Sequence, residues 1–294
     1  MSTEITCSLF MLGAAVRAAG GRVLSSDSVG IGGWVIESRS SCITADAEME
    51  RLKDDMQVLA TPEQFFGSNS LTLRHESSGW VKDKSQPVQI GDAPLWQQSR
   101  RRDMEETGAK PLEYDWTFTT SYTGSLGRAA DGTAGAADAG KGGGGGEAGL
   151  PAWGPTQEQM DRGLLMSRDP ILFFAEIPLY ESELEDHGAS QLSVKVRVMP
   201  KCWYVLLRFW LRVDKVMVRL REARLFCQFD TPERAAVVLR EVKHSEGTFD
   251  ELARGGAPPE GLAYADADAA SAALQAVAPV GVKAFRLERL QLLP

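Results

Sequence analysis

The densest group of side chains that could do chemistry is basic, and it lies in the strongly apolar stretch "VKVRVMPKCWYVLLRFWLRVDKVMVRLREAR" at residues 194–224. From Lys195 to Arg224 the sequence has nine basic residues and two acidic ones, a formal charge of +7. The whole chain carries −8, so the rest of it carries −15. Guanidinium groups bind carboxylates and phosphates through paired hydrogen bonds. The cluster therefore predicts a surface for an anionic partner.

The same pattern allows two other interpretations. In one, the arginines serve the protein's own sheet, with stems that cover aromatic rings and heads that pair with carboxylates of the acidic remainder. In the other, the face binds single-stranded nucleic acid, with bases stacked on Tyr204 and Trp210 beside Arg208 and Arg212. The −15 on the rest of the chain argues against nucleic acid as a partner.

The sequence gives little indication of catalysis, metal binding or a cofactor. Of the three histidines, His187 lies in the motif-like "EDHG" of residues 185–188, but the spaced His, Asp and Asn ligands of a metal site do not accompany it. "GAADAGKG" at 135–142 resembles a phosphate-binding loop, yet Gly142 replaces the Ser or Thr that would hold magnesium. We therefore expect a protein with no enzymatic activity, no metal and no cofactor.

Strand alternation should position the basic side chains. Lys195 and Arg197 point away from a valine face in one period-two segment, and Arg208 and Arg212 lie on the mixed face of the next. A two-residue turn at 214–215 would lead into a third strand, giving an antiparallel meander with one face in the core. The other, wholly apolar face of the second segment consists of Trp203, Val205, Leu207, Phe209, Leu211 and Val213.

Helices should flank this meander. Apolar spacing predicts a helix at 46–59, and a second is expected from Thr156. The segment at 231–244 has Thr231 in a capping position and Pro232 at the first helical position, so it is also predicted as a helix. An Ala-rich helix is expected from Asp266. Strands are expected at 68–75, 114–126, 171–180 and 279–294.

The 294 residues are expected to form a single domain at 30–294, preceded by a poorly ordered segment at 1–29. Residues 127–149 are almost entirely Gly and Ala and should form a disordered insertion, because they cannot bury enough apolar surface to order themselves. Four cysteines without C-x-x-C spacing indicate reduced thiols. No secretory signal and no membrane-spanning run is predicted.

Two blocks of the sequence resemble the TIPRL family, the TIP-forty-one-like proteins. One is "YDWTFTTSYTG" from Tyr114, and the other runs from "LYESELEDHG" through the basic stretch, residues 179–225. Weaker similarity extends the match over most of residues 30–250. The residues of the family's structural motifs are Tyr114, Asp115, Trp116, Asp186, His187 and Gly188.

The resemblance implies a non-catalytic regulator, linked to TOR signalling, that binds the catalytic subunit of type 2A and related serine/threonine protein phosphatases. It implies a single α+β domain built on antiparallel, sandwich-like sheet with flanking helices, and a groove for that subunit's acidic C-terminal tail. Leu220 and Glu222 stand where binding-sensitive Met and Asp residues normally lie. A cytoplasmic monomer is expected, with the nucleus as a second location. The resemblance places Lys195, Arg197 and Arg224 at positions suited to the tail, and Arg208 and Arg212 are expected from the charge pattern to brace the wall of the groove. Together with Leu220 and Glu222, these are the predicted partner-binding residues.

The sequence differs from the family pattern at several positions, but none of these differences removes an arginine of the basic stretch. Glu185 replaces a His, Lys215 replaces the Gly of a hairpin turn, and residues 127–149 have no counterpart in typical members. Phosphatase binding is therefore expected to be retained. Which type 2A phosphatase is preferred, and whether binding inhibits, stores or dismantles it, stays open at this level.

Overall fold

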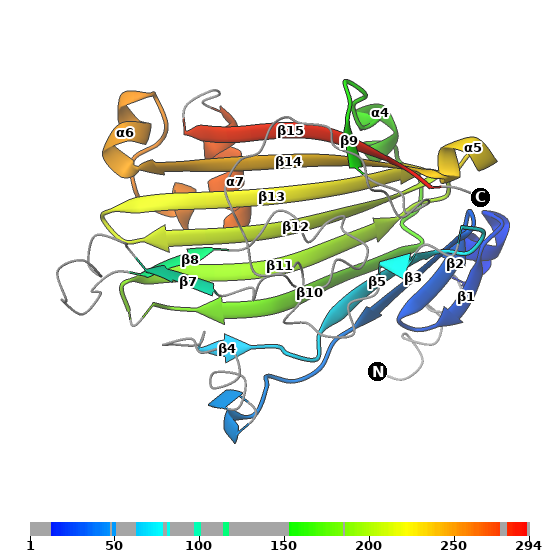
Figure 1. The fold of residues 1–294 in the computed structure, drawn as a ribbon, viewed down its shortest axis with the longest axis horizontal. Coiled ribbons are helices and arrows are strands. Elements are labelled where there is room, and N and C mark those ends of the chain that lie inside the picture. The colour runs from blue at the N-terminus through cyan, green and yellow to red at the C-terminus, as the bar shows by residue number, and fades with distance from the viewer. Residues whose placement is uncertain are drawn as a thin grey trace, which may run out of the picture.

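Long antiparallel strands dominate the computed structural model of the chain (Figure 1). The structure describes residues 13–47, 49–50, 63–78, 81–82, 97–100, 114–117, 153–184, 186–276 and 281–292. Within these residues there are an eight-stranded, a five-stranded and a two-stranded sheet, with a few short helices. The predicted fold class, α+β on antiparallel sheet, is confirmed.

The eight-stranded sheet has the order β4-β10-β11-β12-β13-β14-β15-β9. From β10 to β15 the spatial order follows the chain order, so the meander predicted around the basic stretch is confirmed and is longer than expected. The strands are β4 (Gln64–Phe65), β9 (Trp153–Pro155), β10 (Phe173–Ser182), β11 (Gly188–Val198), β12 (Cys202–Val213), β13 (Met217–Gln228), β14 (Val237–Thr248) and β15 (Val282–Gln291).

Two smaller sheets come from the N-terminal half. The five-stranded sheet has the order β1-β2-β3-β5-β6, and β7 pairs with β8 in the two-stranded sheet. The strand predicted at 114–126 is confirmed at 114–117, and its remainder lies outside the described residues. These strands are β1 (Arg22–Ser25), β2 (Ser28–Ile31), β3 (Trp34–Arg39), β5 (Ser70–His75), β6 (Val81–Lys82), β7 (Gln97–Arg100) and β8 (Tyr114–Thr117).

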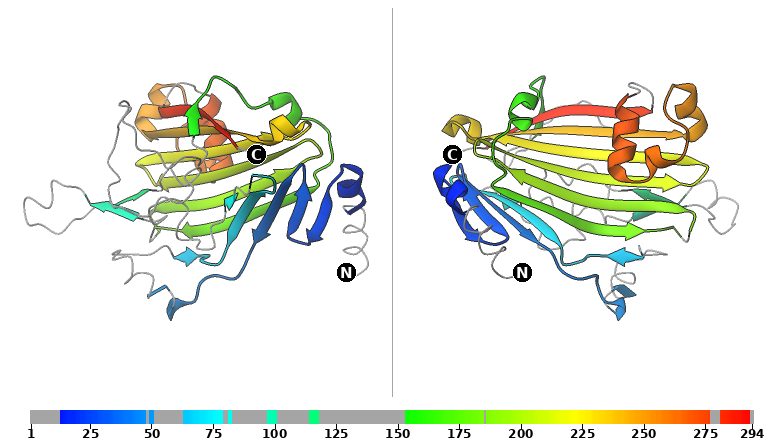
Figure 2. Two further views of the ribbon diagram at one scale, coloured as in Figure 1. Left: turned by 45° about the vertical axis from the view of Figure 1, so that its right-hand side comes forward. Right: turned by 180° about the vertical axis from the view of Figure 1, so that it is seen from behind.

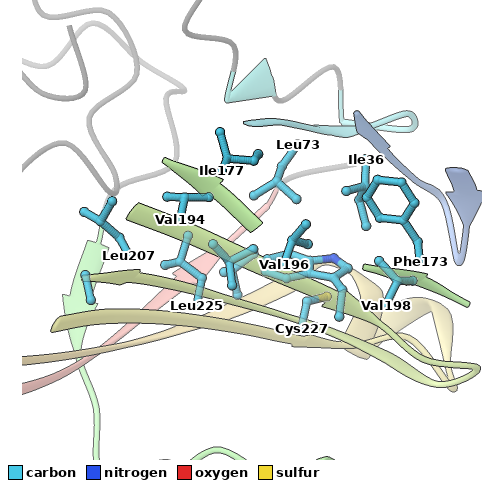
Figure 3. Close-up of a cluster of buried hydrophobic side chains, with 14 of the residues drawn as sticks. Ile36, Leu73, Phe173, Ile177, Val194, Val196, Val198, Leu207, Leu225 and Cys227 are labelled. Carbon is cyan, nitrogen blue, oxygen red and sulfur yellow. The ribbon is translucent and has the colours of Figure 1, made fainter. Parts of the chain in front are cut away.

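The main core lies between the five-stranded sheet and the apolar face of the large sheet. Trp34 of β3 meets Trp203 of β12 edge to face, with ring centroids 4.9 Å apart. The indole Nε1 of Trp34 also donates a hydrogen bond to the carbonyl oxygen of Ala235 at 3.0 Å. Figure 3 shows Ile36 and Leu73 of the small sheet over the valines of β11. Aromatic and branched side chains thus join the two sheets by burying apolar area.

The predicted division of β12 into two faces is confirmed. Its apolar face is buried in the main core, because period-two alternation sends every second side chain toward the small sheet. The opposite face has the arginines, but it is not open to solvent along its whole length. Trp210 is only 5% exposed there. The buried apolar-face residues are Trp203, Val205, Leu207, Phe209 and Leu211, with Val213 packed against them.

Short helices cover this second face, as the view from behind shows (Figure 2). α6 (Phe249–Arg254) begins with a capping box, in which the Thr248 hydroxyl accepts from the Glu251 N–H at 3.2 Å. α7 (Ala267–Ala276) confirms the predicted Ala-rich helix, and the Asp266 carboxylate accepts from the Ala269 N–H at 2.8 Å. With η3 (Leu262–Tyr264), these helices bury part of the sheet against Phe249, Tyr264 and Leu274.

The helix predicted at 231–244 is wrong beyond its first turn. α5 (Pro232–Ala235) begins as expected, with the Thr231 hydroxyl accepting from the Arg234 N–H at 3.4 Å. The chain then forms β14, between β13 and β15. Because both faces of β14 are covered, Val238, Leu239 and Val242 are all buried, and the alternation typical of a half-exposed strand is lost.

The helix expected from Thr156 begins later and is shorter. The Thr156 hydroxyl accepts from the Glu158 N–H at 3.1 Å in a local turn. The helix itself, α4 (Arg162–Leu165), is capped by Asp161, whose carboxylate accepts from the Leu164 N–H at 2.9 Å. α4 lies near the end of the large sheet where β11 joins β12 (Figure 2).

The prediction of a poorly ordered segment at 1–29 is wrong for residues 13–29. Residues 13–18 are helical, β1 and the start of β2 follow, and both Val16 and Val29 are buried in the main core. Residues 1–12 lie outside the described residues, as does the Gly/Ala segment at 127–149. Of the helix predicted at 46–59, residues 46–47 and 49–50 are helical, and the remainder also lies outside the described residues.

The turn between β12 and β13 has three residues instead of the predicted two. The Val216 N–H donates to the Val213 carbonyl at 3.0 Å, and the strand resumes at Met217. Lys215 has φ 61°, a left-handed conformation in which Gly is easier. The Gly that the family resemblance implies at this position would fit that backbone.

Candidate functional site

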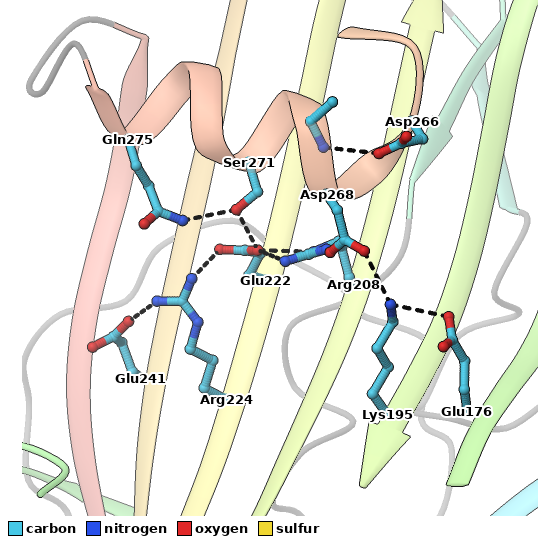
Figure 4. A network of polar contacts seen from close by, with 11 residues as sticks. Glu176, Lys195, Arg208, Glu222, Arg224, Glu241, Asp266, Asp268, Ser271 and Gln275 are labelled. Atoms are coloured by element: carbon cyan, nitrogen blue, oxygen red, sulfur yellow. Dashed lines mark hydrogen bonds and ion pairs between the residues drawn. The ribbon is translucent and has the colours of Figure 1, made fainter. Parts of the chain in front are cut away.

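Charged side chains form cross-strand rows on the helix-covered face of the large sheet (Figure 4). The register of the strands places Arg208 of β12 opposite Glu222 of β13, and Arg224 of β13 opposite Glu241 of β14. Directly opposed residues have Cβ atoms about 5 Å apart, so opposite charges in these positions can pair. Strand register therefore decides which charges meet.

Glu222 is the centre of this network. Its side chain is buried, with the residue 2% exposed. One carboxylate oxygen accepts from Arg208 Nε at 2.9 Å and from the Ser271 hydroxyl at 3.1 Å, and the other pairs with Arg224. Arg208 also pairs with Asp268. Because Ser271 and Asp268 both belong to α7, the network fastens this helix to the sheet.

Lys195 and Arg224 also have carboxylate partners. Lys195 Nζ lies 3.0 Å from Glu176 Oε1 and 3.2 Å from Asp268 Oδ2. Arg224 pairs with Glu241 as well as with the central carboxylate of the network. Burial opposes the charge on Arg224, but its two carboxylate partners outweigh this and raise its pKa. The interpretation in which these residues serve the protein's own sheet therefore holds for both.

Arg212 is paired at the other end of β12. Its Nε donates to Asp214 Oδ1 at 2.8 Å, and its guanidinium lies 5.8 Å from the ring centroid of Trp210. Trp210 is buried beneath the helices, and Arg208 is buried and paired. Neither side chain is available to stack on a base, so the structure gives no support to the nucleic-acid hypothesis.

Arg197 differs from the other predicted partner-binding cations. Its Nη2 donates to the backbone carbonyl of Leu165, in α4, at 2.7 Å. Its Nε is buried without a hydrogen-bond partner. No carboxylate pairs with Arg197 among the residues that the structure describes. A guanidinium that is held by one neutral carbonyl retains most of its capacity to bind an anion.

Arg197 faces a pocket of about 620 Å³ between α4 and the sheet. The volume lies within the range of about 300–1,000 Å³ that is usual for binding pockets. Arg224 and Tyr204 line the sheet side, and Gln275 contributes from α7. The α4 side includes Arg162 and the largely apolar residues Met160, Leu165, Met166 and Ser167.

The polar groups of the pocket can donate hydrogen bonds. Burial raises the pKa of Tyr204, so its phenol stays protonated at neutral pH. Arg197 and Arg224 are charged, and Glu241, the acidic residue of the lining, already pairs with Arg224. The arrangement suits a carboxylate or another anion that approaches Arg197 from the open side.

Comparison with known proteins identifies the family of this chain. The model of the TIP41-like family matches residues 64–253, which is more than half of the chain. The chain belongs to the TIP41-like family. The resemblance found in the sequence is confirmed, and the matched region includes the pocket's Arg197 and Arg224.

Relatives in distant organisms cover most of the chain. A TIP41-like protein of Arabidopsis thaliana is 37% identical over 257 residues, which are 83% of this chain and 86% of that protein. A TIP41-like protein of Homo sapiens is 32% identical over 233 residues, 75% of this chain and 77% of that protein. The type 2A phosphatase activator TIP41 of Saccharomyces cerevisiae is 30% identical over 251 residues, 76% of this chain and 64% of that protein.

Two positions that the family resemblance associates with binding are buried in this TIP41-like chain. Leu220 packs in the core beneath α6 and α7, together with Trp210 and Phe249. Glu222 is the centre of the ion-pair network. Neither lines the pocket. An effect of either side chain on this pocket would therefore act through the neighbouring residues that it contacts.

The Asp186-His187-Gly188 motif forms the turn between β10 and β11. Asp186 has φ 65°, and Gly188 has φ 155° so close to β12 that an added Cβ would lie 2.0 Å from the carbonyl oxygen of Arg212. The carbonyl of His187 accepts from the Asp214 N–H at 3.0 Å. Arg197 lies nine positions after Gly188 in β11, which is about 30 Å along the strand. The side chains of the Tyr114-Asp115-Trp116 motif lie outside the described part of the chain.

The structure brings together only part of the predicted site. Arg197 and Arg224 line one pocket, whereas Lys195, Arg208 and Arg212 lie outside its lining. Residues 160–167, which supply the facing wall of the pocket, were not predicted as part of the site. These residues had no charge pattern or motif, and the only signal was an apolar run followed by "MSRD".

The described residues have neither a metal-ligand cluster nor a membrane-spanning helix. No group of three or more His, Cys, Asp and Glu side chains there could hold a metal ion. No helix there is long and apolar enough to cross a membrane. Cys42, Cys202 and Cys227 are free thiols in this part of the chain.

Proposed function

We propose that this protein is a non-catalytic regulator of type 2A serine/threonine protein phosphatases, acting in TOR signalling. It binds the phosphatase catalytic subunit, and that subunit's acidic C-terminal tail enters the pocket beside α4. Membership of the TIP41-like family supports this role, since the Saccharomyces cerevisiae and Schizosaccharomyces pombe relatives are both named type 2A phosphatase activators.

The observation that carries the proposal is the difference between Arg197 and the other cations. Lys195, Arg208 and Arg212 are each paired with carboxylates of this chain. Arg197 faces an open pocket with a partly buried guanidinium and no carboxylate partner in the described residues. A carboxylate of the tail would supply the missing counter-charge and accept charge-assisted hydrogen bonds.

The test is to titrate the purified phosphatase catalytic subunit, with and without its C-terminal tail, against the wild-type protein and Arg197→Ala. Loss of a charged hydrogen-bonding group from an interface typically costs about 2–5 kcal/mol, so Arg197→Ala should weaken binding at least about tenfold. Deletion of the tail should have a similar effect. Binding should also weaken as salt is raised.

Arg22→Ala is the matched control, because Arg22 is an exposed arginine of β1 that pairs with Glu76. It should bind like wild type. Circular dichroism should show an intact fold for both variants. If Arg197→Ala binds normally, the pocket assignment is wrong, and if the wild-type protein does not bind the phosphatase at all, the proposed function is wrong.

A further inference from the structure

The strand β15 has an open edge over the first part of its length. One of its edges pairs with β14, with a single irregularity where Ser245 follows His244. On the other edge, β9 pairs only with residues 288–290, and the Thr156 N–H donates to the Leu287 carbonyl at 3.1 Å. Residues 282–286 have no second strand among the described residues, as Figure 1 shows along the upper border of the large sheet. Such an edge presents backbone N–H and C=O groups with which another strand can pair.

Phe285 lies within this open edge. Its side chain is 54% exposed, and the adjacent Ala284 and Arg286 are exposed as well. The strand register places Lys243 of β14 directly opposite Phe285, on the same sheet face. Aromatic side chains stabilise a sheet when they pack against a side chain of the next strand. The edge therefore offers an apolar contact in addition to backbone hydrogen bonds.

The charge around Phe285 is positive. Lys243 has no ion-pair partner among the described residues, and the sequence "VKAFR" at 282–286 adds two more basic residues. The nearby carboxylates of Glu241 and Glu288 already pair with arginines of β13 and β14. Opposite charges on neighbouring strands attract and like charges repel. An acidic strand therefore fits this edge, whereas pairing with the β15 of a second copy would bring like charges together.

We infer that residues 282–286 bind an extended acidic segment of a partner protein as an additional strand of the large sheet. The backbone of the segment pairs with the open edge, an apolar side chain covers Phe285, and carboxylates pair with the basic residues around it. Strand addition takes its affinity from main-chain hydrogen bonds and its specificity from alternate side chains. None of residues 282–286 lines the pocket beside α4, so this surface is separate from the one in the proposed function.

The test uses the full-length protein and the fluorescent peptide acetyl-Thr-Glu-Val-Val-Glu-Thr-amide, which has one acidic and one apolar side chain at its centre on each face. Fluorescence anisotropy gives the affinity, and amide hydrogen exchange should become slower in β15 when the peptide binds. Phe285→Ala should lower the affinity about fivefold, and Lys243→Gln about threefold.

Two altered peptides separate the backbone contribution from that of charge. A peptide with Lys in place of Glu should bind at least about tenfold more weakly, because like charges meet. A peptide N-methylated at both Val residues should lose at least as much affinity, because it keeps the side chains but lacks the N–H donors on both of its edges.

Leu24→Ala is the matched control, because Leu24 is 48% exposed on β1, the edge strand of the five-stranded sheet. It should bind the peptide like wild type. Arg197→Ala should also bind like wild type, since its change lies in the pocket. Circular dichroism should show the same fold for every variant.

Several results would overturn the inference. They are equal affinity for the N-methylated or the Lys-containing peptide, slower exchange in β1 instead of β15, or no binding of the acidic peptide at millimolar concentration. Sedimentation would also overturn it if wild type forms dimers and Phe285→Ala does not, because the edge would then join two copies of this chain. None of these results concerns phosphatase binding through the pocket, which has its own test.

Discussion

Two arginine environments on one sheet face differ in what surrounds the guanidinium. Around Glu222, Arg208 and Arg224 lie beneath or beside α7 and are paired with carboxylates (Figure 4). Beside α4, Arg197 has a backbone carbonyl as its partner and opens onto a pocket. The residue type and the sheet face are the same in both places.

The difference shows that charge density on a sheet does not by itself mark a binding surface. A buried ion-pair network contributes little net stability relative to an apolar core, but removal of one member leaves an uncompensated buried charge. An unpaired, partly exposed arginine contributes little to the fold and can contribute much to binding. Mutations in the network should therefore mainly lower the free energy of unfolding. Mutations in the pocket should mainly lower the affinity for the binding partner.

The largest effect is expected from Glu222→Ala. This change leaves the buried Arg208 and the partly buried Arg224 without their shared carboxylate, and it should lower the free energy of unfolding by about 3–5 kcal/mol. Urea denaturation measures it. Glu158→Ala is the control, because Glu158 forms an exposed pair with Arg289, and its loss should cost less than about 1 kcal/mol. Equal losses of unfolding free energy for the two variants would show that the buried network stabilises the fold no more than an exposed ion pair does.

A smaller difference in unfolding free energy is expected between variants of two arginines on the same sheet face. Arg208→Ala removes one partner of a buried carboxylate that keeps Arg224 and Ser271, so it should cost about 3 kcal/mol of unfolding free energy. Arg197→Ala removes a hydrogen bond to one carbonyl and also an unpaired Nε, so it should cost about 1 kcal/mol. Thermal or urea unfolding of the two variants side by side gives the difference. A larger loss for Arg197→Ala would make it a structural residue.

The smallest expected effect is on the free energy of unfolding at acid pH. The hydrogen bond from Arg208 lowers the pKa of Asp268 in the folded protein. This carboxylate therefore adds stability above its unfolded pKa, near 3.9, and that stability is lost as the pH falls through the lower folded value. From about pH 5 to about pH 3, wild type should lose more unfolding free energy than Asp268→Asn does.

The expected difference is below about 1 kcal/mol, because the Asp268 side chain is 70% exposed. Leu262→Ala is the control, since it removes a side chain that is 90% exposed and changes no ionisable group. Its acid profile should be parallel to that of wild type. An identical profile for Asp268→Asn would show that α7 is not held by this ion pair.

Several elements of the fold could be predicted from local pattern. Alternation in residues 192–213 was strong enough to define both faces of β11 and β12. Alternation did not predict β14, because a strand that is covered on both faces has apolar residues at consecutive positions. Thr231 and Pro232 also begin a real helix, the short α5, directly before this strand. Local pattern also failed for residues 13–29, whose ordering depends on packing against the large sheet.

The site was predictable only in part. The sequence identified Arg197 and Arg224 as cations of one face, and the pocket contains both. It could not reveal that Asp268 and Glu176 pair with Lys195, since these residues are far apart in the sequence. It also could not reveal that residues 160–167 form the facing wall.

By itself, the sequence determined which side chains share a sheet face and that the chain belongs to the TIP41-like family. Backbone period and residue type act over a few positions, so both can be read locally. Only the tertiary structure decided which arginines are neutralised. That choice depends on strand register and on the docking of α7 and α4, which bring carboxylates or a carbonyl from distant segments to each guanidinium.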